Sequence, residues 1–210
     1  MDPRLAEVHR LLERYAIEVV EAFELCPWAR AARLGGELAI DVLWGAPADA
    51  AWLAAGERLL ARPEVRVAMV VAPELACTPA ELRALRDRVA ARLPHAGVAD
   101  FHPDAPLDLG SPARLVPYLR RAPDPLLQLV PLALLDAVRA RPLPDRGHQA
   151  QILAGHAAPP RDGAAARIAA DNFARASADR AALAAVLADI AADRVRSYAR
   201  VGISSFPGRR

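Results

Sequence analysis

The run of residues 65–72, VRVAMVVA in sequence, constrains the fold more than any other part of this chain. Arg66 is its one charged residue, so the run is nearly all apolar. A strand of that composition is typical of the middle of a sheet whose two faces are both covered. The chain is therefore expected to place helices against a sheet that has this strand near its centre.

Strands and helices are expected to alternate along the first 140 residues. Further strands are predicted at residues 38–43, 97–101 and 126–130. Helices are predicted at residues 3–25, 48–61, 78–93 and 112–120, and from the fourth strand to residue 140. Thr78 and Glu81 form a capping box at the start of one of them. Alternation with only four short strands predicts a small α/β or α+β fold, a four-stranded sheet layered with helices.

The domain organisation follows from the same pattern. Residues 1–141 are expected to form the α/β core, and residues 142–163 a loop that contains proline and glycine. Residues 164–203 are expected to form alanine-rich helices packed on the core, with a break near residues 176–177, and residues 204–210 a flexible tail. The helices should dock through three apolar residues, Leu183, Leu187 and Ile190.

Composition excludes several classes of function. The formal net charge is only +2, from 27 basic and 25 acidic residues without a block of like charge, so no nucleic-acid partner is expected. Every basic residue is Arg. The absence of lysine excludes a Schiff-base lysine and the lysine of a phosphate-binding loop.

No sequence feature directs the chain to a membrane or out of the cell. The N-terminus lacks the basic and apolar regions of a signal peptide. No apolar stretch approaches the roughly 18 residues that span a bilayer, and two cysteines do not make a disulfide framework. A cytoplasmic protein without a membrane partner is therefore expected.

The first candidate for chemistry is Cys26, in the sequence LCPWA at residues 25–29. Pro27 is expected to interrupt the first long helix, and a short helix should then run to about residue 35. A thiol that caps this short helix would meet unpaired N–H groups and the positive end of the helix dipole, which lower its pKa. Cys26 also falls in phase with the apolar stripe, three residues after Phe23, so a buried inert cysteine is the alternative.

The second candidate is the sequence FHPD at residues 101–104, which follows the third predicted strand. Ligands of α/β folds bind outside strand ends, so His102 could be a base or a ligand, with Asp104 or Asp108 orienting it. The alternative is a loop histidine hydrogen-bonded to backbone. A metal triad of this pair with His148 or His156 is disfavoured, because oxygenases of that kind are built on many-stranded barrels.

The third candidate is the sequence RRAPDP at residues 120–125, which leads into the fourth predicted strand. Its prolines stiffen the segment. A rigidly held Arg120 or Arg121 can grip a carboxylate or phosphate with two parallel hydrogen bonds. An exposed turn is the alternative, because Arg is common throughout the chain.

In this order, the three segments resemble a bacterial family described as domain of unknown function 1415. The likeness covers about residues 5–140 and includes the apolar strand after the arginine segment. Residues 105–108 depart from the family pattern, as does Ala122, where the family is expected to have serine. The resemblance implies no particular reaction, because the family supplies no established activity.

Together these residues predict an enzyme-like site. Cys26 would be the nucleophile or a metal-binding thiolate, His102 the base or second ligand, and Arg121 the anion clamp. The most concrete version is thiol-dependent acyl or group transfer on a small acidic metabolite. The sequence identifies no cofactor, and any metal would be held by Cys26 and His102. The runner-up is a non-catalytic module that binds a partner or a small ligand, with Cys26 buried.

The predicted site depends on the direction of two strands. His102 leaves the end of one strand, and Arg121 precedes the start of another. If these strands are antiparallel neighbours, the exit of one and the entry of the other share an edge of the sheet. If they run parallel, Arg121 falls on the opposite edge and the site does not form.

Overall fold

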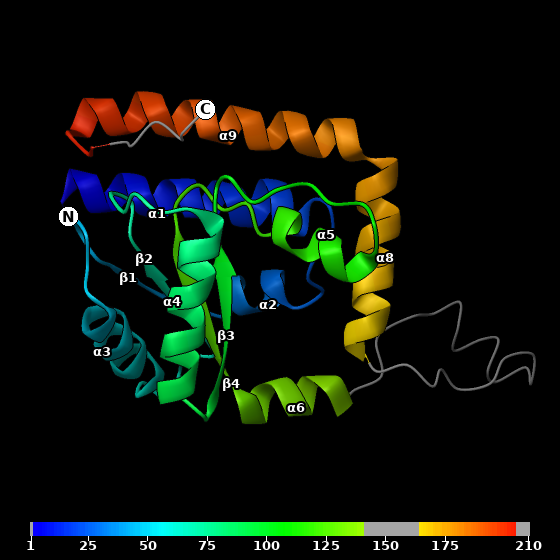
Figure 1. Cartoon of the computed structure of the whole chain (residues 1–210), viewed down its shortest axis with the longest axis horizontal. Coiled ribbons are helices and arrows are strands. Elements are labelled where there is room, and N and C mark those ends of the chain that lie inside the picture. Colours follow the sequence, from blue (N-terminus) through cyan, green and yellow to red (C-terminus); the bar gives the residue numbers. More distant parts are fainter. Residues whose placement is uncertain (1, 141–163, 205–210) are drawn as a thin grey trace, which may run out of the picture.

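A mixed four-stranded sheet lies between two layers of helices in the computed structural model, which describes residues 2–140 and 164–204 (Figure 1). Its strand order is β1-β2-β4-β3. The strands are β1 (Leu38–Val42), β2 (Val67–Val71), β3 (Ala96–Phe101) and β4 (Leu126–Pro131). The predicted α/β class and the four strands are confirmed. The apolar strand β2 is in the interior of the sheet, as its composition indicates.

Three of the four strands end at the same edge of the sheet. β1 and β2 are parallel, whereas β4 runs antiparallel to both β2 and β3. Leu126, the first residue of β4, is paired with Val71 at the end of β2 and with Phe101 at the end of β3. The exit of β3 and the entry of β4 therefore meet, which is the arrangement that the predicted site requires.

One face of the sheet is covered by α3 (Asp49–Leu60) and α4 (Pro79–Arg92). The capping box predicted for α4 is present, with the Glu81 amide donating to Thr78 Oγ1 and the Thr78 amide to the Glu81 carboxylate. These helices bury large apolar side chains against the sheet, among them Trp52, Leu59, Leu82, Leu85 and Val89.

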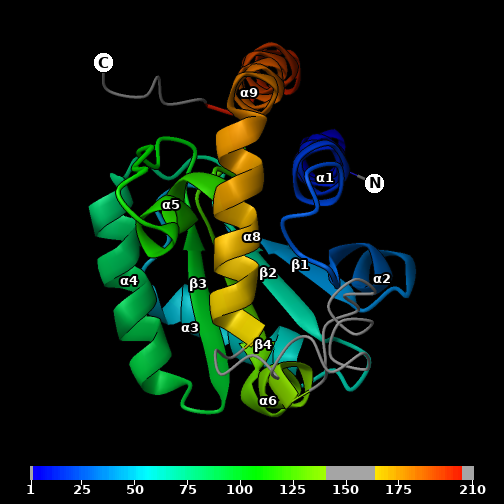
Figure 2. The same cartoon turned by 90° about the vertical axis from the view of Figure 1, so that its right-hand side faces the viewer.

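The other face carries the first and last helices of the chain together with one helix from its middle (Figure 2). They are α1 (Pro3–Tyr15), the π-helical turn η1 (Ala16–Glu21), α2 (Ala29–Leu34), α5 (Pro112–Leu119), α8 (Ala164–Ala178) and α9 (Arg180–Val201). A further helix, α6 (Leu132–Ala140), follows β4 and packs beside β3 and β4. Leu183, Leu187 and Ile190 of α9 are buried in the same cluster as Val8 of α1 and Leu126 of β4.

Two helix boundaries differ from the prediction. The expected single helix over residues 3–25 changes to the wider π-helical turn at Ala16, and Glu24 then takes a left-handed backbone conformation (φ 49°). Arg175 of α8 holds this turn, because it donates to the Glu24 carbonyl at 2.9 Å and pairs with its carboxylate. The break between the last two helices is at Asp179 rather than at residues 176–177. The predicted loop at residues 142–163 and the tail after residue 204 lie outside the described residues.

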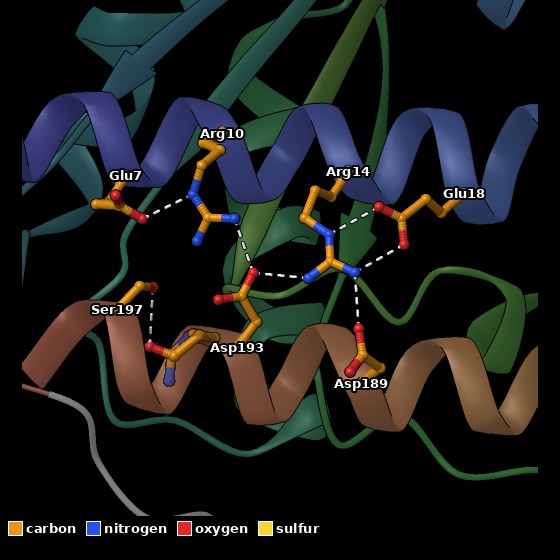
Figure 3. A network of polar contacts seen from close by, with 8 residues as sticks. Glu7, Arg10, Arg14, Glu18, Asp189, Asp193 and Ser197 are labelled. Atoms are coloured by element: carbon orange, nitrogen blue, oxygen red, sulfur yellow. Dashed lines mark hydrogen bonds and ion pairs between the residues drawn. The ribbon is translucent and has the colours of Figure 1, made fainter.

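A network of ion pairs joins α1 to α9, which lie side by side and antiparallel (Figure 3). Asp193 of α9 accepts hydrogen bonds from Arg10 at 2.7 Å and from Arg14 at 2.6 Å. Arg14 also bonds to Glu18 and to Asp189. The bonds from Arg10 and Arg14 lower the pKa of Asp193 to about 2, mainly through Arg10.

We expect Asp193→Asn to destabilise the fold at neutral pH and to lose this effect in acid. Because the folded carboxyl has a pKa near 2 and an unfolded one about 3.9, its contribution is present above about pH 4 and is lost as the pH falls toward 2. Urea unfolding of wild type and variant from pH 7 to 2.5 measures the difference. Asp189→Asn is the control, because this 63% exposed side chain should contribute little. A difference that does not change with pH would contradict the account.

Candidate functional site

A cleft of about 710 Å³ opens at the edge of the sheet where β2 and β3 end and β4 begins. Its walls come from the loop after β2 (residues 73–79), the loop after β3 (residues 102–104) and the segment before β4 (residues 121–125). The fourth wall is the side of α9 that carries Leu187, Ile190 and Arg194. Ligands of α/β proteins bind at such an edge, outside the carboxyl ends of the strands.

His102 is buried, and both of its ring nitrogens are bonded to backbone groups. Nδ1 accepts the amide N–H of Asp104 at 3.0 Å, so in a neutral ring Nε2 carries the proton and donates to the Cys77 carbonyl at 2.9 Å. Burial lowers the pKa of His102 below its ordinary value. The ring therefore joins the loop after β2 to the loop after β3. While both bonds hold, it has no lone pair with which to accept a substrate proton.

Asp104 contacts His102 through its backbone amide rather than through its carboxylate. Its own carboxylate is on an exposed residue at the wall of the cleft. Within the described part of the chain, this carboxylate forms no ion pair.

Arg121 lines the cleft and is held by one backbone bond, from its Nε to the Pro103 carbonyl at 2.7 Å. Its guanidinium also lies over the ring of Tyr118, 5.5 Å from the ring centre. Among the residues that the structure describes, no carboxylate is paired with it. The antiparallel pairing of β3 and β4 thus brings Arg121 next to the His102 segment, as the sequence analysis required.

Arg120, unlike Arg121, does not border the cleft. Its guanidinium lies over the Phe101 ring, 5.5 Å from the ring centre, and burial lowers its pKa. Its carbonyl instead accepts the backbone N–H of His102 at 3.1 Å, so the part it plays at this edge is through the backbone.

A buried polar group that the sequence analysis missed fixes α9 to the edge of the sheet. Asp124, fully buried, accepts from Arg194 Nε at 2.7 Å and from the Tyr198 hydroxyl. Arg194 also donates to the Pro73 carbonyl at 2.9 Å and lines the cleft. Burial raises the pKa of Asp124, while Arg194 and Tyr198 oppose that rise. Arg194 gave no sequence signal, because arginines recur along the whole alanine-rich helix.

Cys26 lies in the turn between η1 and α2 and is not among the residues that line the cleft. Asn172 of α8 bonds to the carbonyl of the preceding residue, Leu25, at 2.9 Å. The α2 helix begins at Ala29 with Trp28 as its cap, so Cys26 is not the capping residue. The amides of Trp28 and Ala29 do lower the pKa of Cys26, as a helix start should, but burial has the larger effect and raises it overall.

The thiol at the cleft belongs to Cys77, which the sequence analysis did not select. Burial, with Glu81 and Asp104 nearby, raises its pKa to about 11. Cys77 lies in the loop between β2 and α4. It is further from its strand than His102, which directly follows β3, so the strand-end signal for Cys77 was weak. Its carbonyl holds His102, and its side chain forms part of the wall.

The described residues contain no group of three His, Cys, Asp or Glu side chains placed to hold a metal ion. His148 and His156, the histidines of the disfavoured metal triad, lie outside those residues. In the same part of the chain, no helix is long and apolar enough to cross a membrane.

Comparisons with family models, with curated proteins and with solved structures gave no match. The resemblance to domain of unknown function 1415 therefore stays a prediction from the three sequence segments.

We expect both cysteines of the folded chain to react slowly with iodoacetamide at pH 7.5. With a pKa of about 11, Cys77 has roughly 300-fold less thiolate than a free cysteine, and burial also raises the pKa of Cys26. Stopped-time alkylation of Cys26→Ala and Cys77→Ala follows each thiol separately, with urea-unfolded protein as the control. A folded Cys26 that reacts faster than free cysteine would restore the activated-thiol hypothesis.

His102 should be the neutral Nε2–H tautomer at pH 7, with a pKa below 6.5. Because its folded pKa is depressed, its contribution to stability is complete above the unfolded pKa of about 6.5 and is lost as the pH falls below it. Ring ¹⁵N shifts in histidine-labelled protein, assigned with His102→Gln, report the tautomer and the pKa. A proton on Nδ1, or a pKa above 7, would contradict the two backbone bonds.

Proposed function

We propose that this protein binds a small carboxylate-bearing molecule, without covalent chemistry, in the cleft at the edge of the sheet. The observation that carries the proposal is Arg121. Its guanidinium lines the cleft, is fixed through Nε, and has no carboxylate partner within the described residues. A planar guanidinium held in this way presents its terminal N–H groups for two parallel bonds to a carboxylate.

The surroundings of Arg121 support a rigid binding site. Pro103, Pro123 and Pro125 border the cleft and restrict the backbone on which the arginine is held. The two backbone bonds of His102 tie the neighbouring loops together. A site whose groups are fixed before the ligand arrives loses less conformational entropy on binding.

Thiol- or metal-dependent group transfer through Cys26 and His102 is the second candidate. The observation in its favour is that the amides of Trp28 and Ala29 lower the pKa of Cys26. The net rise of that pKa and the occupied nitrogens of His102 make it the weaker proposal. The alkylation and tautomer measurements above distinguish the two.

We also propose that the protein acts in the cytoplasm of a bacterium, on a small molecule rather than a nucleic acid. Its net charge of +2 is too small and too evenly spread to attract a polyanion. Cys26 and Cys77 are free thiols rather than a disulfide, which suits a reducing compartment.

Arg121→Gln should abolish carboxylate binding with little loss of stability. The glutamine amide nitrogen occupies the position of Nε, so it can keep the bond to the Pro103 carbonyl while the charge and the outer N–H groups are lost. A ligand at ten times its Kd stabilises the fold by about 1.4 kcal/mol, which is about 3 to 5 °C in Tm for a chain of this size. Thermal unfolding with a panel of mono- and dicarboxylates measures this shift.

The matched control is Arg196→Gln, an exposed arginine of α9 that does not line the cleft. It should keep the full shift. Arg121→Lys, which retains the charge without the planar fork, should keep only part of it. A carboxylate that raises the Tm of wild type and of Arg121→Gln equally would refute the assignment of Arg121, and no shift with any carboxylate would refute the proposed function.

A further inference from the structure

The charged side chains of the cleft divide into those that are already engaged and those that are not. Arg194 is paired with the buried carboxylate of Asp124. The Glu81 carboxylate accepts from the amide and the hydroxyl of Thr78. Arg121 and Asp104 remain, and within the described residues neither belongs to an ion pair. The cleft thus offers a ligand one positive and one negative group.

These two groups belong to segments that are bonded to each other. Arg121 Nε donates to the carbonyl of Pro103, the residue immediately before Asp104. Although the segments are in contact, the two side chains do not pair with one another across the described structure. Opposite charges that line one cleft and are left unpaired suit a ligand that also carries both charges, because each can then gain a charge-assisted hydrogen bond.

The Asp104 carboxylate also disfavours the binding of some anions. A phosphate or a dicarboxylate at Arg121 would bring a second negative charge toward Asp104, and the carboxylate of Glu81 lines the same cleft. Like charges that are brought together in a partly dry site are unfavourable. A single carboxylate accompanied by an ammonium group avoids this repulsion.

Apolar side chains also line the cleft. Leu187, Ile190 and Val195 of α9 face Leu75 and the prolines of the two loops around the opening. Val195 is 58% exposed, so its side chain is accessible to a ligand. A volume of about 710 Å³ is in the range of small-molecule sites, so there is room for an apolar group beside the two charges.

We infer that the cleft binds a free amino acid with a bulky apolar side chain. Its carboxylate is held by Arg121, its ammonium group by Asp104, and its side chain lies against α9. This inference rests on the proposed function and adds to it the second charge and the apolar group of the ligand.

Isothermal titration of the full chain with leucine, isoleucine, phenylalanine and tryptophan tests the inference. For the tightest of these, the N-acetyl derivative removes the positive charge, and the corresponding amine without its carboxyl group removes the negative one. Each derivative should bind about 10- to 100-fold more weakly, the loss that accompanies one charge-assisted hydrogen bond. Asp104→Asn should weaken binding of the amino acid by a similar factor and leave the affinity for the N-acetyl derivative unchanged. The variant keeps the backbone amide that bonds to His102, so the loop should hold its conformation.

The controls are Asp171→Asn and Arg196→Gln, exposed residues away from the cleft that should leave all affinities unchanged. If the N-acetyl derivative binds as well as the amino acid, and Arg121→Gln abolishes both, the carboxylate site stands and the amino-acid inference is wrong. If the amino acid binds equally to wild type and Asp104→Asn, the inference is also wrong. If no tested amino acid or N-acetyl derivative binds, the inference is overturned, and the wider carboxylate panel decides the proposed function separately.

Discussion

The buried carboxylate of Asp124 is the interaction on which the functional edge of this protein depends. It is fully enclosed and is balanced by Arg194 and Tyr198, both from α9. An ionised carboxylate in such a place is tolerated only with its partners present, and removing one partner of a buried pair typically costs about 3–5 kcal/mol. The bond therefore requires α9 to lie against the entry of β4. The cleft exists because this requirement places the apolar side of α9 opposite the loops that follow β2 and β3.

Much of the fold could be predicted because it depends on local patterns. The apolar run of β2, the capping box of α4 and the alternation of strands and helices each act over a few residues. The direction of β4 could not be read in this way. It depends on how β4 pairs with β2 and β3, and it decides whether His102 and Arg121 meet. The order of strands and helices along the chain leaves this pairing open.

The candidate site was harder to predict, for a related reason. Cys26 precedes a predicted helix start, which suggests reactivity, and Cys77 has no such feature. Only the packing around each cysteine shows that Cys77 is the one that borders the cleft. His102 was correctly placed at a strand end, yet its chemical state depends on two backbone groups, one of them 25 residues earlier in the chain. Arg194 had no distinguishing neighbour in sequence. Burial and pairing of polar groups arise from tertiary structure. Motifs alone therefore identify candidate site residues without showing their protonation or their hydrogen-bond partners.

The pairing of α1 with α9 has a consequence for how the molecule folds. These helices cover residues 3–15 and 180–201, so the contacts between them close a loop of more than 150 residues. During synthesis the sheet strands, which end at Pro131, leave the ribosome well before α9. Until then, the apolar face of α1 lacks its final neighbours on α9; this face carries Val8, Leu11 and Leu12. Long-range contacts of this kind slow folding and leave apolar surface open to association, so the nascent chain is most exposed to aggregation shortly before its last helix appears.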